Sequence, residues 1–162
     1  MTDGPRTDGT ASMWITLDVN GAECSVEVTA DDTLVDVLRG ELNLTSCRET
    51  CGLGLCGSCT VVVDGHAVSA CLAPAFQADG AMVRTAEGLQ RGTEPSRLQR
   101  AFVEEQAFQC SFCTPGFLMS ATALLEEEGP RSVEDALSGH VCRCGSYDQI
   151  VRAVERTVAG SD

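Results

Sequence analysis

The chain has 162 residues and a formal net charge of −13, with 43% hydrophobic and 22% charged residues. This composition is typical of a globular protein with one ordinary domain or two small ones, and it argues against wholesale disorder. No apolar run approaches the roughly 18 residues that a membrane-spanning helix needs. Nucleic acids and anionic membranes both require a basic face, which the acidic excess disfavours. We therefore expect no nucleic-acid partner and no membrane insertion.

Ten cysteines accompany only five Phe, one Tyr and one Trp. Small domains that lack large apolar side chains are often stabilised by disulfides or by metal. The first nine residues are polar and acidic and do not resemble a secretory signal, so we expect a reducing compartment, the cytoplasm. Clustered cysteines in such a compartment more often hold metal than pair as disulfides.

The first part of the chain is predicted to be a small mixed sheet with one helix packed across it. We expect residues 1–12 to be a disordered lead-in and residues 13–90 to form the first domain. Period-two patterns and turn residues predict five strands, at residues 14–19, 24–28, 60–63, 67–71 and 81–85. Asn20-Gly21 is a strong hairpin signal, and Thr33 can cap a helix whose apolar residues are Leu34, Val37, Leu38 and Leu42.

Near Gly92 the hydrophobic period changes from 2 to 3.6, and we assign residues 91–162 to a second, helical domain. Four helices are expected there, over residues 96–108, 114–128, 132–137 and 146–158. Thr114 is predicted to be the N-cap of the second of these helices, and Ser132 and Ser146 to begin capping boxes. Core-facing stripes are expected in the second helix (Phe117, Leu118, Ala121, Leu124, Leu125) and in the fourth (Tyr147, Ile150, Val151, Val154, Val158).

The first cysteine group is Cys51, Cys56, Cys59 and, after a longer gap, Cys71. The Cys-x4-Cys-x2-Cys spacing with a distant fourth cysteine is the plant-type [2Fe–2S] pattern. A loop that surrounds a cluster must turn sharply and direct N–H groups at sulfur, which the glycines between these cysteines permit. This group therefore predicts a first [2Fe–2S] cluster.

The second group is Cys110, Cys113, Cys142 and Cys144. These residues lie in two helix–helix loops that share one end of an up-down bundle, so we expect the four thiolates to converge on one point. Cys113 and Cys144 lie just before helices, whose N-terminal N–H groups stabilise thiolate charge. Zinc could also be held by four thiolates and stays open as an alternative at this point.

Three stretches together resemble the small iron–sulfur subunit of the molybdenum hydroxylases, the xanthine dehydrogenase and carbon monoxide dehydrogenase family. They are Cys51-Gly-Leu-Gly-Leu-Cys56-Gly-Ser-Cys59, Gln109-Cys110-Ser-Phe-Cys113-Thr-Pro-Gly, and Leu137-Ser-Gly-His-Val-Cys142-Arg-Cys144-Gly-Ser-Tyr147. The resemblance implies an α+β fold: an N-terminal plant-type ferredoxin-like β-grasp domain followed by a C-terminal four-helix bundle, each with a [2Fe–2S] cluster.

The same resemblance implies an electron-transfer role in an oxidoreductase, with no substrate chemistry and no catalytic residue in this chain. It implies a large subunit with the molybdopterin cofactor, a medium subunit with FAD, and a dimer of such heterotrimers. Electrons would pass from the molybdopterin centre through the second cluster and then the first to FAD. Gln109 and Cys144 would lie beside the pterin. The alternatives are a free-standing ferredoxin and a structural zinc adaptor.

Some residues depart from the usual sequence pattern of the family, or have no assigned role. Ser111 stands where Gly is commoner, and His140 replaces a frequent Asn. We expect Cys24 to be a small buried residue and Cys47 a bystander beside the first cluster. His66 and His140 are predicted to be structural or surface residues, and Arg143 could offset cluster charge. The substrate of the complex cannot be read from this chain.

Overall fold

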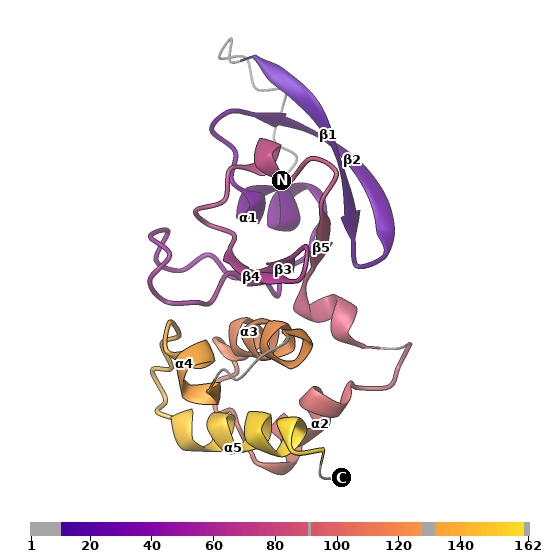
Figure 1. The fold of residues 1–162 in the computed structure, drawn as a ribbon. Coiled ribbons are helices and arrows are strands. Elements are labelled where there is room, and N and C mark those ends of the chain that lie inside the picture. Colours follow the sequence, from indigo (N-terminus) through magenta and orange to yellow (C-terminus); the bar gives the residue numbers. More distant parts are fainter. Residues whose placement is uncertain (1–10, 91, 128–131, 161–162) are drawn as a thin grey trace.

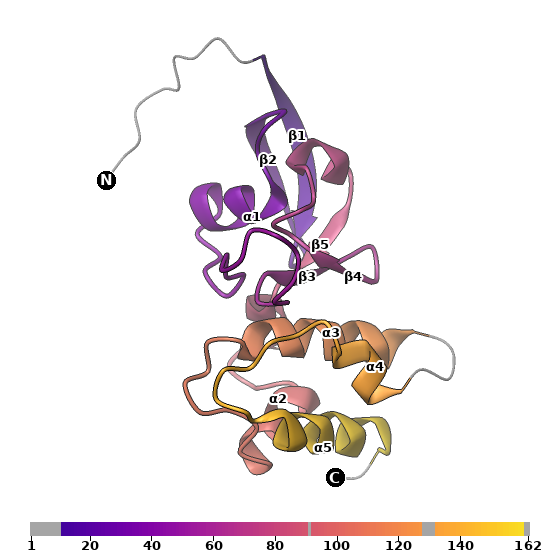
Figure 2. The same cartoon turned by 90° about the vertical axis from the view of Figure 1, so that its left-hand side faces the viewer.

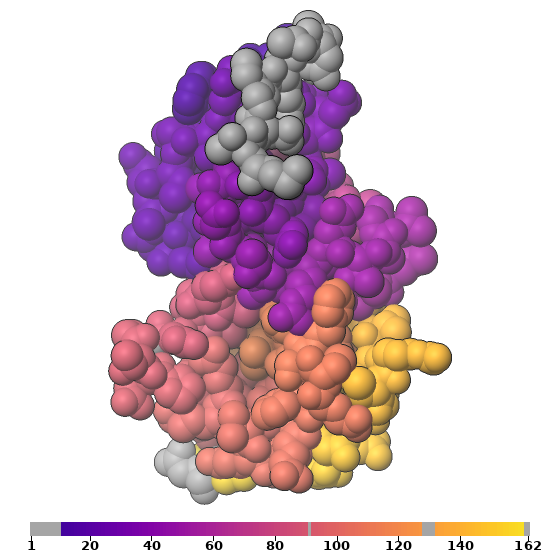
Figure 3. Space-filling model, turned by 180° about the vertical axis from the view of Figure 1, so that it is seen from behind, coloured from indigo at the N-terminus to yellow at the C-terminus, as the bar shows by residue number. Residues whose placement is uncertain are grey.

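A computed structural model describes residues 11–90, 92–127 and 132–160. The sheet half, residues 11–90, stands on the helical half, residues 92–160, and the two form one stack (Figures 1 and 3). Most of the expected lead-in, and residue 91 where we expected the second domain to begin, lie outside the described residues. The first strand begins at Ser12, inside the expected lead-in.

The sheet half is a five-stranded mixed sheet with the order β2-β1-β5-β3-β4. Only β1 and β5 run parallel, while the other neighbours are antiparallel. The strands are β1 (Ser12–Val19), β2 (Ala22–Thr29), β3 (Thr60–Val63), β4 (His66–Ser69) and β5 (Met82–Arg84). All five predicted strands are present, and the sheet is mixed as expected.

Two tight hairpins fix the register of this sheet. Asn20 and Gly21 both have positive φ, of 56° and 84°, which is the two-residue turn that the sequence predicts. Asp64 and Gly65 repeat this geometry between β3 and β4. In β1 the alternate residues Ile15, Leu17 and Val19 are buried, so one face of the hairpin contributes to the core.

One helical segment covers the inner face of this sheet (Figure 2). It comprises α1 (Leu34–Asp36) and the π-helical turn η1 (Val37–Glu41). Thr33 caps it, as the sequence predicted, and also forms a capping box with Asp36, which was not predicted. Leu34, Val37 and Leu38 are buried against the sheet. Short 3₁₀ turns, η2 (Ala75–Ala78) and η3 (Ala86–Leu89), complete the sheet half.

The helical half contains four helices among its described residues. They are α2 (Arg97–Glu104), α3 (Thr114–Glu126), α4 (Val133–Leu137) and α5 (Tyr147–Val158). The first ends four residues before the predicted 108, because Gln106 adopts φ 52° and breaks the helical path. Two predicted caps are wrong. Thr114 is the first residue of α3, so Cys113 and not Thr114 is its N-cap, and Ser146 precedes α5 without a side-chain cap bond.

Helix α3 lies between the sheet and the other helices, and this position explains why its predicted stripe was incomplete (Figures 1 and 2). Phe117, Leu118, Ala121 and Leu124 face the helical core as predicted. Met119 and Ala123 on the opposite side pack against Val62 of β3. The predicted core residue Leu125 is 39% exposed. A helix in a middle layer is buried on both faces, so amphipathicity alone does not predict its contacts.

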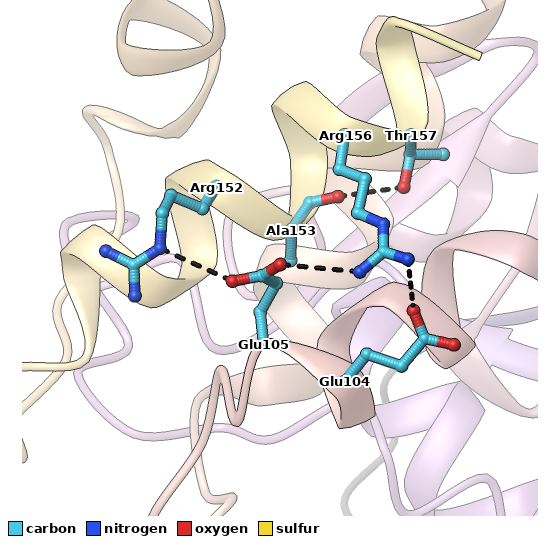
Figure 4. Close-up of polar contacts among 6 residues, drawn as sticks. All are labelled: Glu104, Glu105, Arg152, Ala153, Arg156 and Thr157. Atoms are coloured by element: carbon cyan, nitrogen blue, oxygen red, sulfur yellow. Dashed lines mark hydrogen bonds and ion pairs between the residues drawn. The ribbon is translucent and has the colours of Figure 1, made fainter. Parts of the chain in front are cut away.

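Helix α5 packs on α2, and two arginines of α5 form ion pairs with glutamates at the C-terminal end of α2 (Figure 4). Arg156 reaches Glu104 at 2.9 Å and Glu105 at 3.5 Å, and Arg152 reaches Glu105 at 3.4 Å. Ile150 and Val154 are buried as predicted, but Tyr147 and Val158 are substantially exposed. In the part of the chain that the structure describes, no helix is long and apolar enough to cross a membrane.

Candidate iron–sulfur cluster sites

The loop from Cys51 to Cys59 has the backbone that its glycines predict. Gly52, Gly54 and Gly57 have φ of 63°, 69° and 71°, a region that glycine enters at no steric cost. The loop bends back on its own sulfur, and the Leu53 N–H donates to Cys51 Sγ at 3.4 Å. Backbone N–H groups aimed at sulfur are the donors that stabilise thiolate charge.

The three thiols of this loop and the thiol of Cys71 are arranged as two pairs. Cys51 and Cys56 are close enough for the Cys56 thiol to lower the pKa of Cys51, and Cys59 and Cys71 are close enough for the Cys71 thiol to raise the pKa of Cys59. Cys51 and Cys56 are half-buried, whereas Cys59 and Cys71 are buried. The site therefore has an outer pair near solvent and an inner pair against the sheet core.

The outer and inner thiols of the first site differ in acidity. Hydrogen bonds from the backbone N–H of Leu53, the backbone N–H of Leu55 and the Cys56 thiol lower the pKa of Cys51 to about 6. Burial is the largest cause that raises the pKa of Cys59 to about 11. An outer thiolate is thus preorganised for metal, while the inner thiol needs a metal charge to offset its burial.

The second site has the same arrangement. Cys110 pairs with Cys144 on the outside, where Cys110 is exposed and Cys144 half-buried. Cys113 pairs with Cys142 on the inside, and both are buried. Cys113 directly precedes α3, and only Gly145 and Ser146 separate Cys144 from α5, so both thiols lie near helix starts as predicted.

The acidities in the second site follow from the same two causes. Hydrogen bonding from the Phe112 backbone N–H, then from the Cys144 thiol, lowers the pKa of Cys110. Burial raises the pKa of Cys113 to about 12. For Cys142 burial acts upward, but hydrogen bonds from the Ser146 N–H and other donors outweigh it and lower the pKa. The Tyr147 hydroxyl also accepts from the Cys142 N–H at 2.7 Å and fixes this loop.

The four thiols of each group lie near one another, since Cys56 of the outer pair acts electrostatically on Cys59 of the inner pair, and Cys142 acts likewise on Cys110. Whether each group of four converges on one cluster stays a prediction. Among the described residues, no three Cys, His, Asp or Glu side chains lie close enough to hold a single metal ion. A structural zinc site needs four ligands about 2.0–2.3 Å from one ion. Two pairs of thiols instead fit a two-metal group in which each iron takes two cysteines, as in a [2Fe–2S] cluster. The donor sets of both sites therefore fit [2Fe–2S] better than zinc.

The two cysteine loops meet backbone to backbone at the junction between the sheet half and the helical half. The Val141 N–H donates to the Cys56 carbonyl at 3.1 Å. This bond joins Cys56 of the first site to the residue before Cys142 of the second site. Gly116 of α3 faces the Gly57 carbonyl so closely that a Cβ there would lie 2.1 Å from its oxygen. We call this contact between residues 56–60, 116–120 and 140–141 the seam.

His140 lies inside the seam, and the prediction of a plain structural or surface residue missed this location. Its ring is 4.6 Å from the Phe117 ring, and its Nε2 lies 3.2 Å from Ser120 Oγ and 3.4 Å from Thr60 Oγ1. Burial lowers the pKa of His140. A Cβ on Gly57 would come within 2.5 Å of this ring. The His140 ring therefore occupies its place only because residue 57 has no side chain.

The remaining predicted residues are also placed. Gln109 Nε2 donates to the Cys144 carbonyl at 3.3 Å on the exposed side of the second site, which brings these two predicted residues together. Cys47 is buried beside the first site, where its thiol donates to the Cys59 carbonyl and burial raises its pKa to about 12. Cys24 is half-buried, not buried as expected. Arg143 and His66 are exposed.

Comparison with known proteins finds two models of cluster-binding domains along the chain. Residues 17–89 match the 2Fe–2S iron–sulfur cluster binding domain, and residues 85–155 match the [2Fe–2S] binding domain. The nicotine 6-hydroxylase small subunit of Paenarthrobacter nicotinovorans is 48% identical over 143 residues, covering 86% of each chain. The nicotinate dehydrogenase small FeS subunit of Eubacterium barkeri is 40% identical over 147 residues, covering 89% of this chain and 94% of that one.

Solved structures share the fold as well. Quinoline 2-oxidoreductase from Pseudomonas putida 86 superposes with a TM-score of 0.85 at 37% identity, over 92% of this chain and 94% of that one. The aldehyde oxidoreductase from Desulfovibrio desulfuricans gives 0.84 at 43% identity, covering 90% of this chain but 17% of that larger chain.

Fold, cysteine pairs and comparisons define an iron–sulfur protein with two [2Fe–2S] binding domains that serves as an electron-transfer component of an oxidoreductase. The chain belongs to the small iron–sulfur subunits of the molybdenum hydroxylase family.

Proposed function

We propose that this chain relays electrons from a molybdopterin-containing large subunit to a FAD-containing medium subunit, through its second cluster and then its first. The observation that carries the proposal is the direct backbone contact between two four-cysteine sites. When bound, each [2Fe–2S] cluster takes up and releases single electrons. The protein holds each cluster with paired thiols, and the seam fixes the two sites relative to each other.

The ligand sets we propose follow the thiol pairs. Cys51, Cys56, Cys59 and Cys71 hold the first cluster in a ferredoxin-like β-grasp domain at residues 13–90. The second cluster is held by Cys110, Cys113, Cys142 and Cys144 in a four-helix bundle at residues 91–162. Separate buried cores on the two sides of α3 support this division.

Electron entry is proposed at the outer pair of the second site. Cys110 and Cys144 lie toward solvent, and Gln109 is held against the Cys144 carbonyl at 3.3 Å. An exposed amide in this position can hydrogen bond to a pterin presented by the large subunit, since it has both a donor and an acceptor group. Gln109 and Cys144 are therefore the proposed pterin-proximal residues.

Exposed apolar side chains beside both sites favour membership of a complex over a free-standing ferredoxin. Leu53, Leu55 and Leu72, next to the first site, are 65%, 70% and 58% exposed. Phe112 and Val141, next to the second, are also exposed. Permanent interfaces are more apolar than transient ones, and large exposed apolar patches mark protein contacts. We propose that the medium subunit covers the leucines and that the assembly is a dimer of heterotrimers.

The cytoplasm is the proposed location. None of the ten cysteines is in a disulfide, and eight of them are proposed iron ligands. Clustered cysteines that bind metal and do not pair as disulfides are typical of a reducing compartment.

Iron analysis and spectroscopy of the anaerobically purified chain test the cluster assignment. We expect about four irons per chain and two distinct paramagnetic signals on reduction, because each [2Fe–2S] cluster contains two irons. Stoichiometric zinc in a colourless protein would instead favour the adaptor alternative. Co-expression with neighbouring genes tests the partners, since a member of the complex co-purifies with molybdenum and flavin whereas a free ferredoxin stays alone.

Paired variants test the ligand assignment. Cys56→Ser should abolish the signal of the first cluster only, and Cys142→Ser that of the second only, since a cluster needs all four thiolates. Cys24→Ser is the matched control and should leave both signals intact, because this half-buried thiol lies in β2, outside both groups. Retention of both signals in Cys56→Ser would contradict the assignment.

A further inference from the structure

Arg48 extends from the sheet half into the loop of the second site. Its backbone N–H donates to the Ser58 carbonyl at 3.2 Å, which fixes Arg48 beside the first cysteine loop. Its Nη1 donates to the carbonyls of Ser111 and Phe112 at 2.9 Å and 2.5 Å. The guanidinium carbon also lies 4.9 Å from the centre of the Phe112 ring. Ser111 and Phe112 are the two residues between Cys110 and Cys113.

The charge of Arg48 is not neutralised by an ion pair with any described carboxylate. Arg84, Arg152 and Arg156 are paired with glutamates by contrast. Arg48 is also half-buried, and a partly buried charge is screened less by salt than an exposed one. Two carbonyls and one aromatic face therefore hold a net positive charge against the second site.

We propose that Arg48 raises the reduction potential of the second cluster, as a charge that the sheet half supplies to the helical half. The inference rests on the proposed function, because it needs a cluster at the second site. Reduction adds negative charge to a cluster, and a fixed cation nearby stabilises the reduced form. The second cluster is therefore easier to reduce when the sheet half is docked.

The contacts indicate why the second cluster responds more than the first. The Arg48 side chain leads away from its own loop and ends on the backbone between two ligands of the second site. Arg39 is a comparable arginine whose side chain stays within the sheet half. Its Nη1 donates to the carbonyls of Thr45 and Cys47 at 3.2 Å and 2.9 Å, on the side of the first site. Each of these arginines donates to two backbone carbonyls beside a different site, so Arg39 serves as the control for Arg48.

Redox titration of the full, cluster-loaded chain, followed by the two paramagnetic signals, tests the proposal. Cys56→Ser identifies which signal belongs to which cluster. In Arg48→Gln, which keeps an N–H donor but loses the charge, we expect the reduced-to-oxidised ratio of the second cluster at fixed potential to fall about tenfold. For a one-electron centre this equals a potential about 59 mV lower. Arg48→Lys should retain most of the wild-type potential, and Arg39→Gln should shift the first cluster more than the second.

The outcomes separate the proposal from its alternatives. An unchanged second cluster in Arg48→Gln, an equal shift of both clusters, or the same shift in Arg48→Lys would each overturn it, because the effect would not come from a local charge. If Arg48→Gln does not load the second cluster, Arg48→Met decides, since it also removes the charge but keeps a long unbranched side chain. A lower potential of the second cluster there supports the proposal, and an unchanged potential overturns it. Absence of two iron signals in the wild type would instead refute the proposed function.

Discussion

Replacing Gly116 by alanine should open the seam between the two cluster sites. The added Cβ would lie 2.1 Å from the Gly57 carbonyl oxygen and 3.2 Å from Ser58 Cα. These are backbone atoms, so no side-chain rotation can relieve the contact. Helix α3 must move away from the loop that holds Cys56 and Cys59.

The magnitude follows from two opposing terms. Overpacking in a closely packed core typically costs about 1–3 kcal/mol. Alanine in place of glycine stabilises a helix by at most about 1 kcal/mol. Because the 2.1 Å contact is with backbone, the overpacking cost belongs in the upper part of this range, about 2–3 kcal/mol. Subtracting about 1 kcal/mol leaves a net loss of about 1–2 kcal/mol, which for a chain of this size lowers the melting temperature by about 2–8 °C.

Thermal unfolding of the cluster-loaded chain, followed by loss of its visible absorbance, measures this effect. Gly40→Ala is the matched control, because a Cβ at Gly40 meets no atom within 4 Å and its φ is not positive. The control should be as stable as wild type or slightly more so. The magnetic interaction between the two reduced clusters should weaken in Gly116→Ala but not in the control. A Gly116→Ala chain as stable as the control, with that interaction unchanged, would refute the reasoning.

Three further predictions concern single side chains. Gln109→Ala should keep both cluster signals yet slow reduction of the second cluster by substrate roughly tenfold in the complex, the equivalent of one hydrogen bond of about 1.4 kcal/mol; unchanged stopped-flow rates would contradict the pterin contact. Bonding to Arg84 lowers the pKa of Glu126, so its stabilisation is complete above the unfolded pKa near 4.3 and is lost as pH falls through the lower folded value. Urea unfolding should therefore separate wild type from Glu126→Gln by about 0.2–1 kcal/mol from pH 8 to 5, with convergence below about pH 4, since this pair is over a third exposed. His140→Ala should cost about 2–3 kcal/mol in the same assay, because it empties a buried space between Phe117 and Gly57.

Local chemistry determined the elements that could be predicted from the sequence. Asn20-Gly21 and Asp64-Gly65 specify turns with positive φ, and Thr33 specifies a helix start, because each acts through its own backbone or the next turn. The cysteine spacing likewise selected eight of ten cysteines in two groups. It did so because a cluster loop needs fixed intervals and glycine between its ligands.

Contacts between distant residues could not be predicted in this way. Nothing local distinguishes Met119 or Ala123 from ordinary helix residues, yet both meet β3 because α3 is a middle layer. The spacing of the cysteines likewise gave no sign that one pair in each group would be buried and the other would lie toward solvent.

The sequence by itself determined which segments become strands or helices and indicated which cysteines are the proposed iron ligands, since spacing and periodicity act over a few residues. Only the tertiary structure decided that Cys56 meets Val141, that His140 fills the space over Gly57, and that Arg48 serves a site more than sixty residues away. These contacts depend on how two independently patterned halves dock. Docking is governed by packing and shape across the whole surface, which no short stretch of sequence encodes.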